Sequence, residues 1–272
     1  MWPVIKRTAA NPSNNNPRTL PAEFSCAGLT ASLSGVQASV RIGASGFSYK
    51  EWLGRFYPPK LPAVQMLGFY AERLNTVEIN YTFRAIPKRS MLEGWAAKTP
   101  EHFRFALKAP QRITHFGRLH GVAAILGHFV ETATALGARL GPILFQLPPD
   151  FARNDPVLEA FLETLDKRVR AAFEFRHRSW FDSAIFDLLR RYNAALCIAE
   201  TDTLVTPLEC TAPHVYLRLR KPAYDTPALT VWADRIRSFA ADADEVYVFF
   251  KHEAAAPELA AELARLLSQG LP

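Results

Sequence analysis

Eight short apolar runs follow one another along most of this chain, and helical patterns separate most of them. The runs span residues 41–46, 76–80, 104–109, 142–147, 171–176, 195–200, 214–220 and 245–252. Each run has the length of a buried strand, whereas Leu259, Leu263 and Leu266 recur at helical spacing after the last one. Eight strands alternating with helices over residues 41–272 predict a (β/α)8 TIM-type barrel, a fold that typically takes about 250 residues.

The glycine-rich turn of the competing architecture is missing. A doubly wound open sheet that binds nucleotides has a GxGxxG or GxxxxGK[ST] turn, and residues 43–46 (GASG) match neither. The stretch from Glu200 to His214 is too short for a full crossover helix, so we expect an irregular connection between the sixth and seventh strands. Asp155 and Pro156 predict a helix start, with Asp155 as the N-cap.

The first forty residues lack this order. Residues 11–17 (NPSNNNP) form a cluster of breakers, and no helical period follows them. We therefore expect a flexible N-terminal extension over residues 1–40 and one barrel domain over residues 41–272. No apolar run is long enough to cross a bilayer, so no membrane partner is expected.

Charge and cysteine content narrow the class of protein. The formal net charge of +6 at pH 7 is a small excess for 272 residues, and it suits an anionic ligand or nucleic acid without requiring either. Cys26, Cys197 and Cys210 form no CxxC pair, which argues against a disulfide framework or a structural zinc site. This cysteine usage fits a reducing compartment, so we expect a cytoplasmic protein.

Polar residues alternate with apolar ones toward the end of the predicted strands. In the fifth strand Glu174 and Arg176 share one face, and Phe173 and Phe175 share the other. The outer face of a barrel strand packs against helices, so the polar face should point into the barrel, where aliphatic side chains are usual. The polar residues concerned are Glu78, Asn80, Lys108, Gln146, Glu174, Arg176, Glu200, Arg218 and Lys251. Buried charge there predicts a self-satisfied ion-pair network or a ligand site at the carboxyl-terminal mouth, and we favour the ligand site.

Several motifs, in order along the chain, resemble those of one family. They are residues 43–52 (GASGFSYKEW), similar to a GxSGxxYxxW signature, 76–80 (TVEIN), 103–110 (FRFALKAP) with 113–115 (ITH), 144–149 (LFQLPP), 173–177 (FEFRH) with 179–180 (SW), and 216–219 (YLRL). By these motifs the chain resembles the YecE-like family of TIM-barrel proteins (domain of unknown function seventy-two) over residues 41–272. The resemblance implies the barrel but no reaction, so the function has to be argued from the site.

Carboxylates at the mouth make acid/base catalysis the first hypothesis. Glu78 and Glu174 are the preferred acid/base pair and Glu200 is a further candidate, because burial and nearby cations can hold carboxyls at different pKa values. The substrate would be an anionic or hydroxyl-rich small molecule, and the enzyme a hydrolase, lyase or isomerase. Lys108 is another catalytic candidate, since a lysine desolvated among cations can form a Schiff base.

A second set of residues is expected to hold the substrate. Arg176, Arg218 and Lys108 would bind a phosphate or carboxylate group. The other substrate-binding candidates are Asn80, Gln146, His177, Lys251, Tyr49, Trp52 and His115. Of these, Tyr49 and Trp52 could stack on a base or sugar.

Two alternatives come from other classes of protein. A metal-dependent hydrolase or isomerase would draw on the oxygen and imidazole groups of Glu78, Glu174, His177, Glu200 and His252. Nearby cations would repel a metal ion, so we assign no metal ligand and no cofactor, while a divalent metal stays open. A non-catalytic phosphate- or nucleic-acid-binding protein would use the same cations, although no recognised nucleic-acid motif is present. The sequence does not indicate an oligomeric state.

Overall fold

The computed structural model describes residues 26, 30–33, 36–201, 203–251 and 254–269. Its centre is a ring of parallel strands: β2 (Val36–Ala44), β3 (Thr76–Ile79), β4 (Arg104–Lys108), β5 (Leu140–Gln146), β6 (Ala171–Glu174), β7 (Ala195–Glu200), β8 (His214–Leu219) and β9 (Glu245–Phe250). Consecutive strands pair in parallel, and β9 pairs with β2, with Tyr247 opposite Arg41. This last pairing closes the sheet, which confirms the predicted TIM-type barrel.

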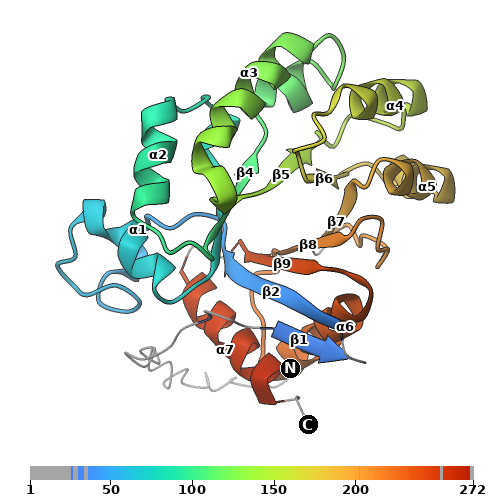
Figure 1. Ribbon diagram of the computed structural model, residues 1–272. Helices are drawn as coiled ribbons and strands as arrows, with labels where there is room; N and C mark the ends of the chain where they lie inside the picture. Colours follow the sequence, from blue (N-terminus) through green and yellow to red (C-terminus); the bar gives the residue numbers. More distant parts are fainter. Residues whose placement is uncertain (1–25, 27–29, 34–35, 202, 252–253, 270–272) are drawn as a thin grey trace, which may run out of the picture.

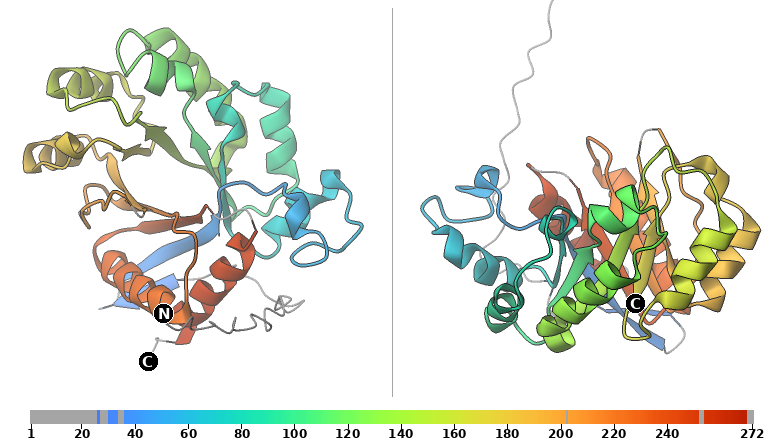
Figure 2. Two further views of the ribbon diagram at one scale, coloured as in Figure 1. Left: turned by 180° about the vertical axis from the view of Figure 1, so that it is seen from behind. Right: turned by 90° about the horizontal axis from the view of Figure 1, so that it is seen from above.

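Helices follow most of the strands and form the outer layer (Figure 1). They are α1 (Ala63–Ala71), α2 (Arg89–Ala97), α3 (Ala123–Ala133), α4 (Asp155–Thr164), α5 (Ser183–Arg191), α6 (Thr226–Asp242) and α7 (Ala256–Gln269). α6 and α7 lie side by side against β2, and the strands stay inside the helices in the views of Figure 2. None of the helices in the described ranges is long and apolar enough to cross a bilayer.

The connection between β7 and β8 contains no helix among its described residues, as predicted. Threonine hydroxyls from this segment bind the backbone of β7 instead. The Thr206 Oγ1 accepts from Ala199 N at 3.3 Å, and the Thr211 Oγ1 accepts from Leu196 N at 2.7 Å. Thr211 also donates to Ala194 O at 2.8 Å. Side chains thus satisfy buried backbone groups that a regular crossover would leave to neighbouring elements.

The N-cap of α4 is one residue earlier than expected. The Asn154 Oδ1 accepts a hydrogen bond from Val157 N at 3.2 Å, which makes Asn154 the cap and Asp155 the first helical residue. The Asp155 carboxylate instead accepts from Arg153 Nε at 2.6 Å. The predicted N-cap is therefore wrong by one residue: Asn154 caps the helix, and the Asp155 carboxylate is engaged by Arg153.

The boundary expected at residue 40 does not coincide with a strand boundary. β2 begins at Val36, and β1 (Thr30–Leu33) pairs with it in the antiparallel direction. Cys26 is also buried, and its carbonyl oxygen accepts from Asn75 Nδ2 at 3.0 Å. A signal was present in residues 36–42 (VQASVRI), where apolar and polar residues alternate as in a strand. The rest of the expected extension lies outside the described residues.

The interior of the barrel has an apolar layer with a polar layer above it. Small residues of β4, β6 and β7 face aromatic residues of β8 and β9 in a core cluster of their own: Ala106, Leu144, Ala172, Ala195, Cys197, Tyr216, Tyr247 and Phe249. Cys197 is a buried free thiol in this layer. Two residues after Ala106, Leu144 and Ala172, the side chains with the same inward orientation are polar. They are Lys108, Gln146 and Glu174. This polar layer lies at the carboxyl ends of the strands, where barrel enzymes carry their sites.

Candidate functional site

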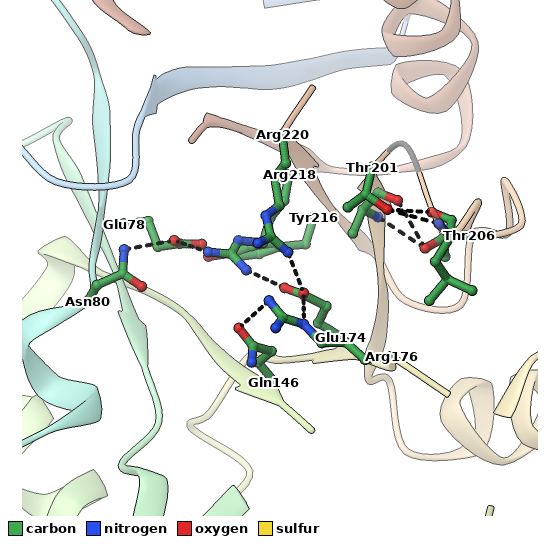
Figure 3. A network of polar contacts seen from close by, with 12 residues as sticks. Glu78, Asn80, Gln146, Glu174, Arg176, Thr201, Thr206, Tyr216, Arg218 and Arg220 are labelled. Carbon is green, nitrogen blue, oxygen red and sulfur yellow. Dashed lines mark hydrogen bonds and ion pairs between the residues drawn. The ribbon is translucent and has the colours of Figure 1, made fainter. Parts of the chain in front are cut away.

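Arg218 on β8 joins two carboxylates inside the barrel, and Figure 3 shows it lying between them. Its Nη2 donates to Glu78 Oε1 at 2.8 Å, and its Nη1 donates to Glu174 Oε2. All three side chains are buried, with exposures of 0 to 1%. Because Glu78 comes from β3 and Glu174 from β6, one guanidinium group ties together three separate strands.

Glu174 is saturated with hydrogen bonds from arginines. Its Oε1 accepts from Arg176 Nε at 2.9 Å and from Arg220 Nη1 at 3.2 Å, in addition to the contact of Oε2 with Arg218. Arg176 also donates to Gln146 Oε1 at 2.9 Å. Burial acts to raise the pKa of Glu174, but the three guanidinium groups outweigh it and lower this pKa to about 2. Glu174 is therefore a carboxylate at neutral pH.

Glu78 has one cationic partner and two neutral ones. Besides Arg218, its Oε1 accepts from Asn80 Nδ2 at 3.2 Å and its Oε2 accepts from the Tyr216 hydroxyl at 2.8 Å. Burial acts to raise the pKa of Glu78, yet Arg218 and the hydroxyl groups of Ser45 and Tyr216 lower it below its ordinary value. Both glutamates thus have lowered pKa values and share one arginine, so neither is held protonated near neutral pH as a general acid would need.

Lys108 on β4 lies beside this network without pairing to it. Its Nζ stands 4.0 Å from the centre of the Phe83 ring, and no described residue hydrogen-bonds or ion-pairs with it. Burial, together with the positive charge of Arg218, lowers the pKa of Lys108 to about 8. The nearby glutamates act in the opposite direction, but their oxygens already accept from the arginines, from Asn80 and from Tyr216. The amine thus titrates closer to neutral pH than an ordinary lysine does.

His115 also contacts Phe83. The two rings meet edge to face with centroids 4.9 Å apart, and the His115 Nδ1 lies 2.9 Å from Thr114 Oγ1. Burial, followed by the charges of Lys108 and Arg176, lowers the pKa of His115 below its ordinary 6.5. The imidazole is therefore neutral at pH 7, able to accept or to donate a proton.

A cavity of about 430 Å³ opens beside the arginines. It is lined by Pro149, Glu174, Phe175, Arg176, Thr201, Thr203, Leu204, Arg220 and Pro222. Arg176 is 28% exposed and Arg220 20%, so both reach the surface of the cavity while held by Glu174. The Nε of Arg220 is buried and has no hydrogen-bond partner among the described residues. Lys251 follows β9 at the same mouth, where burial and the charges of Arg218 and Arg220 lower its pKa.

Glu200 is not part of this network, contrary to expectation. Its Oε2 accepts from Trp232 Nε1 of α6 at 2.9 Å, and its Oε1 lies 2.7 Å from Lys221 Nζ. On β7 the inward position belongs to Cys197, so Glu200, three residues later, has the opposite orientation. The prediction that Glu200 is a catalytic residue of the central network is therefore wrong, because its side chain points away from the interior of the barrel.

Trp52 likewise does not line the cavity. It is buried and stacks on Tyr70 with ring centroids 6.2 Å apart, within a cluster that includes Phe56 and Tyr57. Tyr49 packs on Trp52 at 4.9 Å, and its hydroxyl donates to Ser45 O at 2.6 Å. The expected stacking of a ligand on Trp52 is corrected, because its ring faces are covered by other aromatic side chains.

His177 has a local structural role. Its Nδ1 lies 2.8 Å from Ser179 Oγ and accepts from Ser179 N, which caps the short helix η5 (Arg178–Trp180). The metal alternative relied on His177, Glu200 and His252 together with the two buried glutamates. His252 lies outside the described residues, and within those described no three His, Cys, Asp or Glu side chains gather as metal ligands.

Three residues of the site were not among the predicted site residues. Tyr216 and Arg220 have the same orientation as Arg218, and the period of two along β8 indicates both. Phe83, whose ring contacts the Lys108 amine, lies in the short helix η2 (Tyr81–Phe83) after β3. No sequence pattern marked Phe83, because its contact with Lys108 depends on the path of a loop.

Comparisons with known proteins agree with this architecture. A family model described as "Protein of unknown function DUF72" matches residues 41–271, which confirms the resemblance noted above. UPF0759 protein YecE of Escherichia coli (strain K12) is 30% identical over 143 residues, 52% of this chain and 50% of the relative. UPF0759 protein YunF of Bacillus subtilis (strain 168) is 29% identical over 158 residues, 54% of each chain. The chain thus spans about half the length of the curated relatives it matches.

A solved structure extends the comparison to the whole barrel. The crystal structure of a DUF72 family protein from Thermotoga maritima at 2.20 Å resolution superposes with a TM-score of 0.74. It is 24% identical, and the superposition covers 85% of this chain and 99% of that chain. At this identity the likeness supports the fold alone.

Proposed function

This chain belongs to the DUF72 family of proteins of unknown function, and from that premise we propose that its barrel is an enzyme for an anionic small molecule. The molecule binds at the carboxyl-terminal mouth, where a side chain transfers a proton to or from it. One observation carries the proposal: cations outnumber carboxylates in the polar layer. Arg176 and Arg220 line the cavity with Glu174, and Arg218 and Lys108 lie beside them with Glu78.

The anionic group of the substrate binds to Arg176 and Arg220. Arg218 is fully buried and both of its Nη atoms are taken, so it supports the site from below rather than contacting the ligand. Arg176 and Arg220 both line the cavity, and Glu174 holds both guanidinium groups in place. Guanidinium groups positioned in this way suit the planar geometry of a carboxylate or the oxygens of a phosphate.

Lys108 is the group that transfers a proton to or from the bound substrate. General acid/base catalysis works best when the pKa of the group is close to the working pH, and Lys108 has a pKa of about 8. Glu78 and Glu174 are the positioning residues of this arrangement, because their oxygens are engaged by hydrogen-bond donors. This assignment departs from the glutamate pair favoured by the sequence and retains the lysine that the sequence also offered.

A small molecule fits these observations better than a polynucleotide. Two of the cations on the rim that could follow a phosphate backbone are engaged by carboxylates: Arg118 pairs with Asp150 at 2.6 Å, and Lys221 pairs with Glu200 at 2.7 Å. The cations that face the cavity are half-buried and close together, whereas nucleic-acid binding uses cations spread along a surface.

Calorimetric titration with malonate and with inorganic phosphate tests the proposal. We expect the wild-type protein to bind at least one of them, and Arg176→Gln to weaken that binding about tenfold, the cost of one charge-assisted hydrogen bond. Glu174 keeps Arg218 and Arg220 in this variant, so the fold is retained. Arg178→Gln is the matched control, since Arg178 is exposed two residues away and carries the same charge. The proposal is contradicted when wild-type protein binds neither anion, or when both variants weaken binding equally.

A further inference from the structure

Lys108 has surroundings that set it apart from the other cations of the mouth. The guanidinium groups of Arg176, Arg218 and Arg220 are all hydrogen-bonded to Glu174, whereas the Lys108 amine meets the face of Phe83 at 4.0 Å. The amine is close enough to both glutamates to feel their charge, yet no oxygen of either one accepts from it within the described part of the chain. The carboxylate oxygens nearest the lysine are therefore engaged by the arginines, by Asn80 and by Tyr216.

An amine in this position can act as a nucleophile, because an appreciable fraction of it is neutral. Its pKa of about 8 leaves roughly a tenth of it neutral at pH 7, about 300-fold more than for a lysine of ordinary pKa 10.5. Desolvation beside other cations is the arrangement by which lysines are activated toward carbonyl groups. The Phe83 ring covers the amine on one side, which limits its solvation without giving it a hydrogen-bond acceptor.

We propose that Lys108 forms a Schiff base with an anionic carbonyl compound whose carboxylate or phosphate is bound by Arg176 and Arg220. This inference rests on the proposed function and names its substrate class. The neutral amine attacks the carbonyl carbon, a C–N bond forms, and the carbonyl electron pair moves to oxygen. One nitrogen proton passes to that oxygen, and the resulting hydroxyl leaves with a further proton as water. The product is an imine, so one water is released for each bond formed and no oxidant or reductant is needed.

His115 is placed to assist this exchange of protons. It shares the Phe83 ring with Lys108, and its pKa is lowered by burial and by the Lys108 charge itself. A neutral imidazole accepts the proton that the amine gives up and returns it to the departing hydroxyl. We assign His115 as a proton carrier for the bond that Lys108 makes.

Reductive trapping tests the inference on the full chain. The protein is incubated with pyruvate, with dihydroxyacetone phosphate or with acetone, each with cyanoborohydride, and its intact mass is measured. A reduced Schiff base adds the mass of the probe less one oxygen atom. We expect one adduct with an anionic probe, mapped to Lys108 by peptide analysis, and at least tenfold less adduct with acetone. The amount of adduct formed with pyruvate, compared with that formed with dihydroxyacetone phosphate, distinguishes a carboxylate substrate from a phosphate substrate.

Two variants separate the possible outcomes. Lys108→Arg should abolish the adduct, while Lys221→Arg should retain it, because the Lys221 amine is held by Glu200. Equal labelling of many lysines, or trapping unchanged in Lys108→Arg, overturns the inference. If no adduct forms but malonate or phosphate still binds, the Schiff base is refuted and the proposed anion site stands. If the anions do not bind either, both proposals fail.

Discussion

Replacing Arg218 with methionine removes the one cation that serves both buried glutamates. Glu174 keeps Arg176 and Arg220, but Glu78 is left with the neutral donors of Asn80 and Tyr216. Removing one partner of a buried ion pair typically costs about 3–5 kcal/mol of unfolding free energy, because a charge stays buried without compensation. We expect Arg218→Met to lose an amount in this range at neutral pH.

The pH dependence of that loss gives a second and sharper signature. In the wild type the pKa of Glu78 is below its ordinary 4.5, so its stabilising effect is present above that pH and is lost on acidification. In Arg218→Met, burial without a cation raises the pKa of Glu78 above 4.5, so the folded state takes up the proton first. The difference between variant and wild type should therefore be largest near pH 7 and shrink toward pH 4.5.

Urea unfolding followed by circular dichroism across this pH range measures both quantities. The matched control is the double variant Arg218→Met with Glu78→Gln, which removes the orphaned charge together with its partner. We expect the double variant to be at least about 1 kcal/mol more stable than Arg218→Met alone at neutral pH. A loss below about 1 kcal/mol for Arg218→Met, or a loss that does not change with pH, would refute the account of the network.

Two further predictions concern residues that do not line the cavity. Burial lowers the pKa of His214 from 6.5 to about 4, so below pH 6.5 the unfolded state binds a proton that the folded state refuses. Unfolding free energy should fall by up to about 3 kcal/mol between pH 6.5 and 4, and His214→Gln should flatten this part of the profile; equal slopes in urea titrations would count against it. Trp52→Ala should cost about 3–5 kcal/mol of stability and leave the affinity for the anion, measured by calorimetry, unchanged. A loss of affinity without a loss of stability would restore Trp52 to the site.

The period-two pattern of the strands carried most of what the sequence could predict. It placed Glu78, Glu174 and Arg218 on inward faces, and the structure brings these three residues into contact. This worked because the outer face of each strand must be apolar to pack on helices, which leaves only one direction for a polar side chain. The same principle identified the carboxyl-terminal mouth as the place where polar residues gather.

The pattern failed where the orientation of a strand end or a loop decided the outcome. Glu200 ends β7 with the wrong orientation, and a single alternating run does not reveal which of two neighbouring residues points inward. Trp52 belongs to a loop segment whose aromatic partners come from α1 and from nearby turns. The engagement of both glutamates by arginines also depends on distances across the barrel, which no local pattern encodes.

A crystal structure of the protein with malonate tests the central claim most directly. The account predicts a malonate carboxylate within hydrogen-bond distance of the Arg176 and Arg220 guanidinium groups, with the ion pairs of Glu174 retained. Malonate bound only at exposed cations outside the mouth, with the Arg176 and Arg220 side of the cavity holding none, would contradict it.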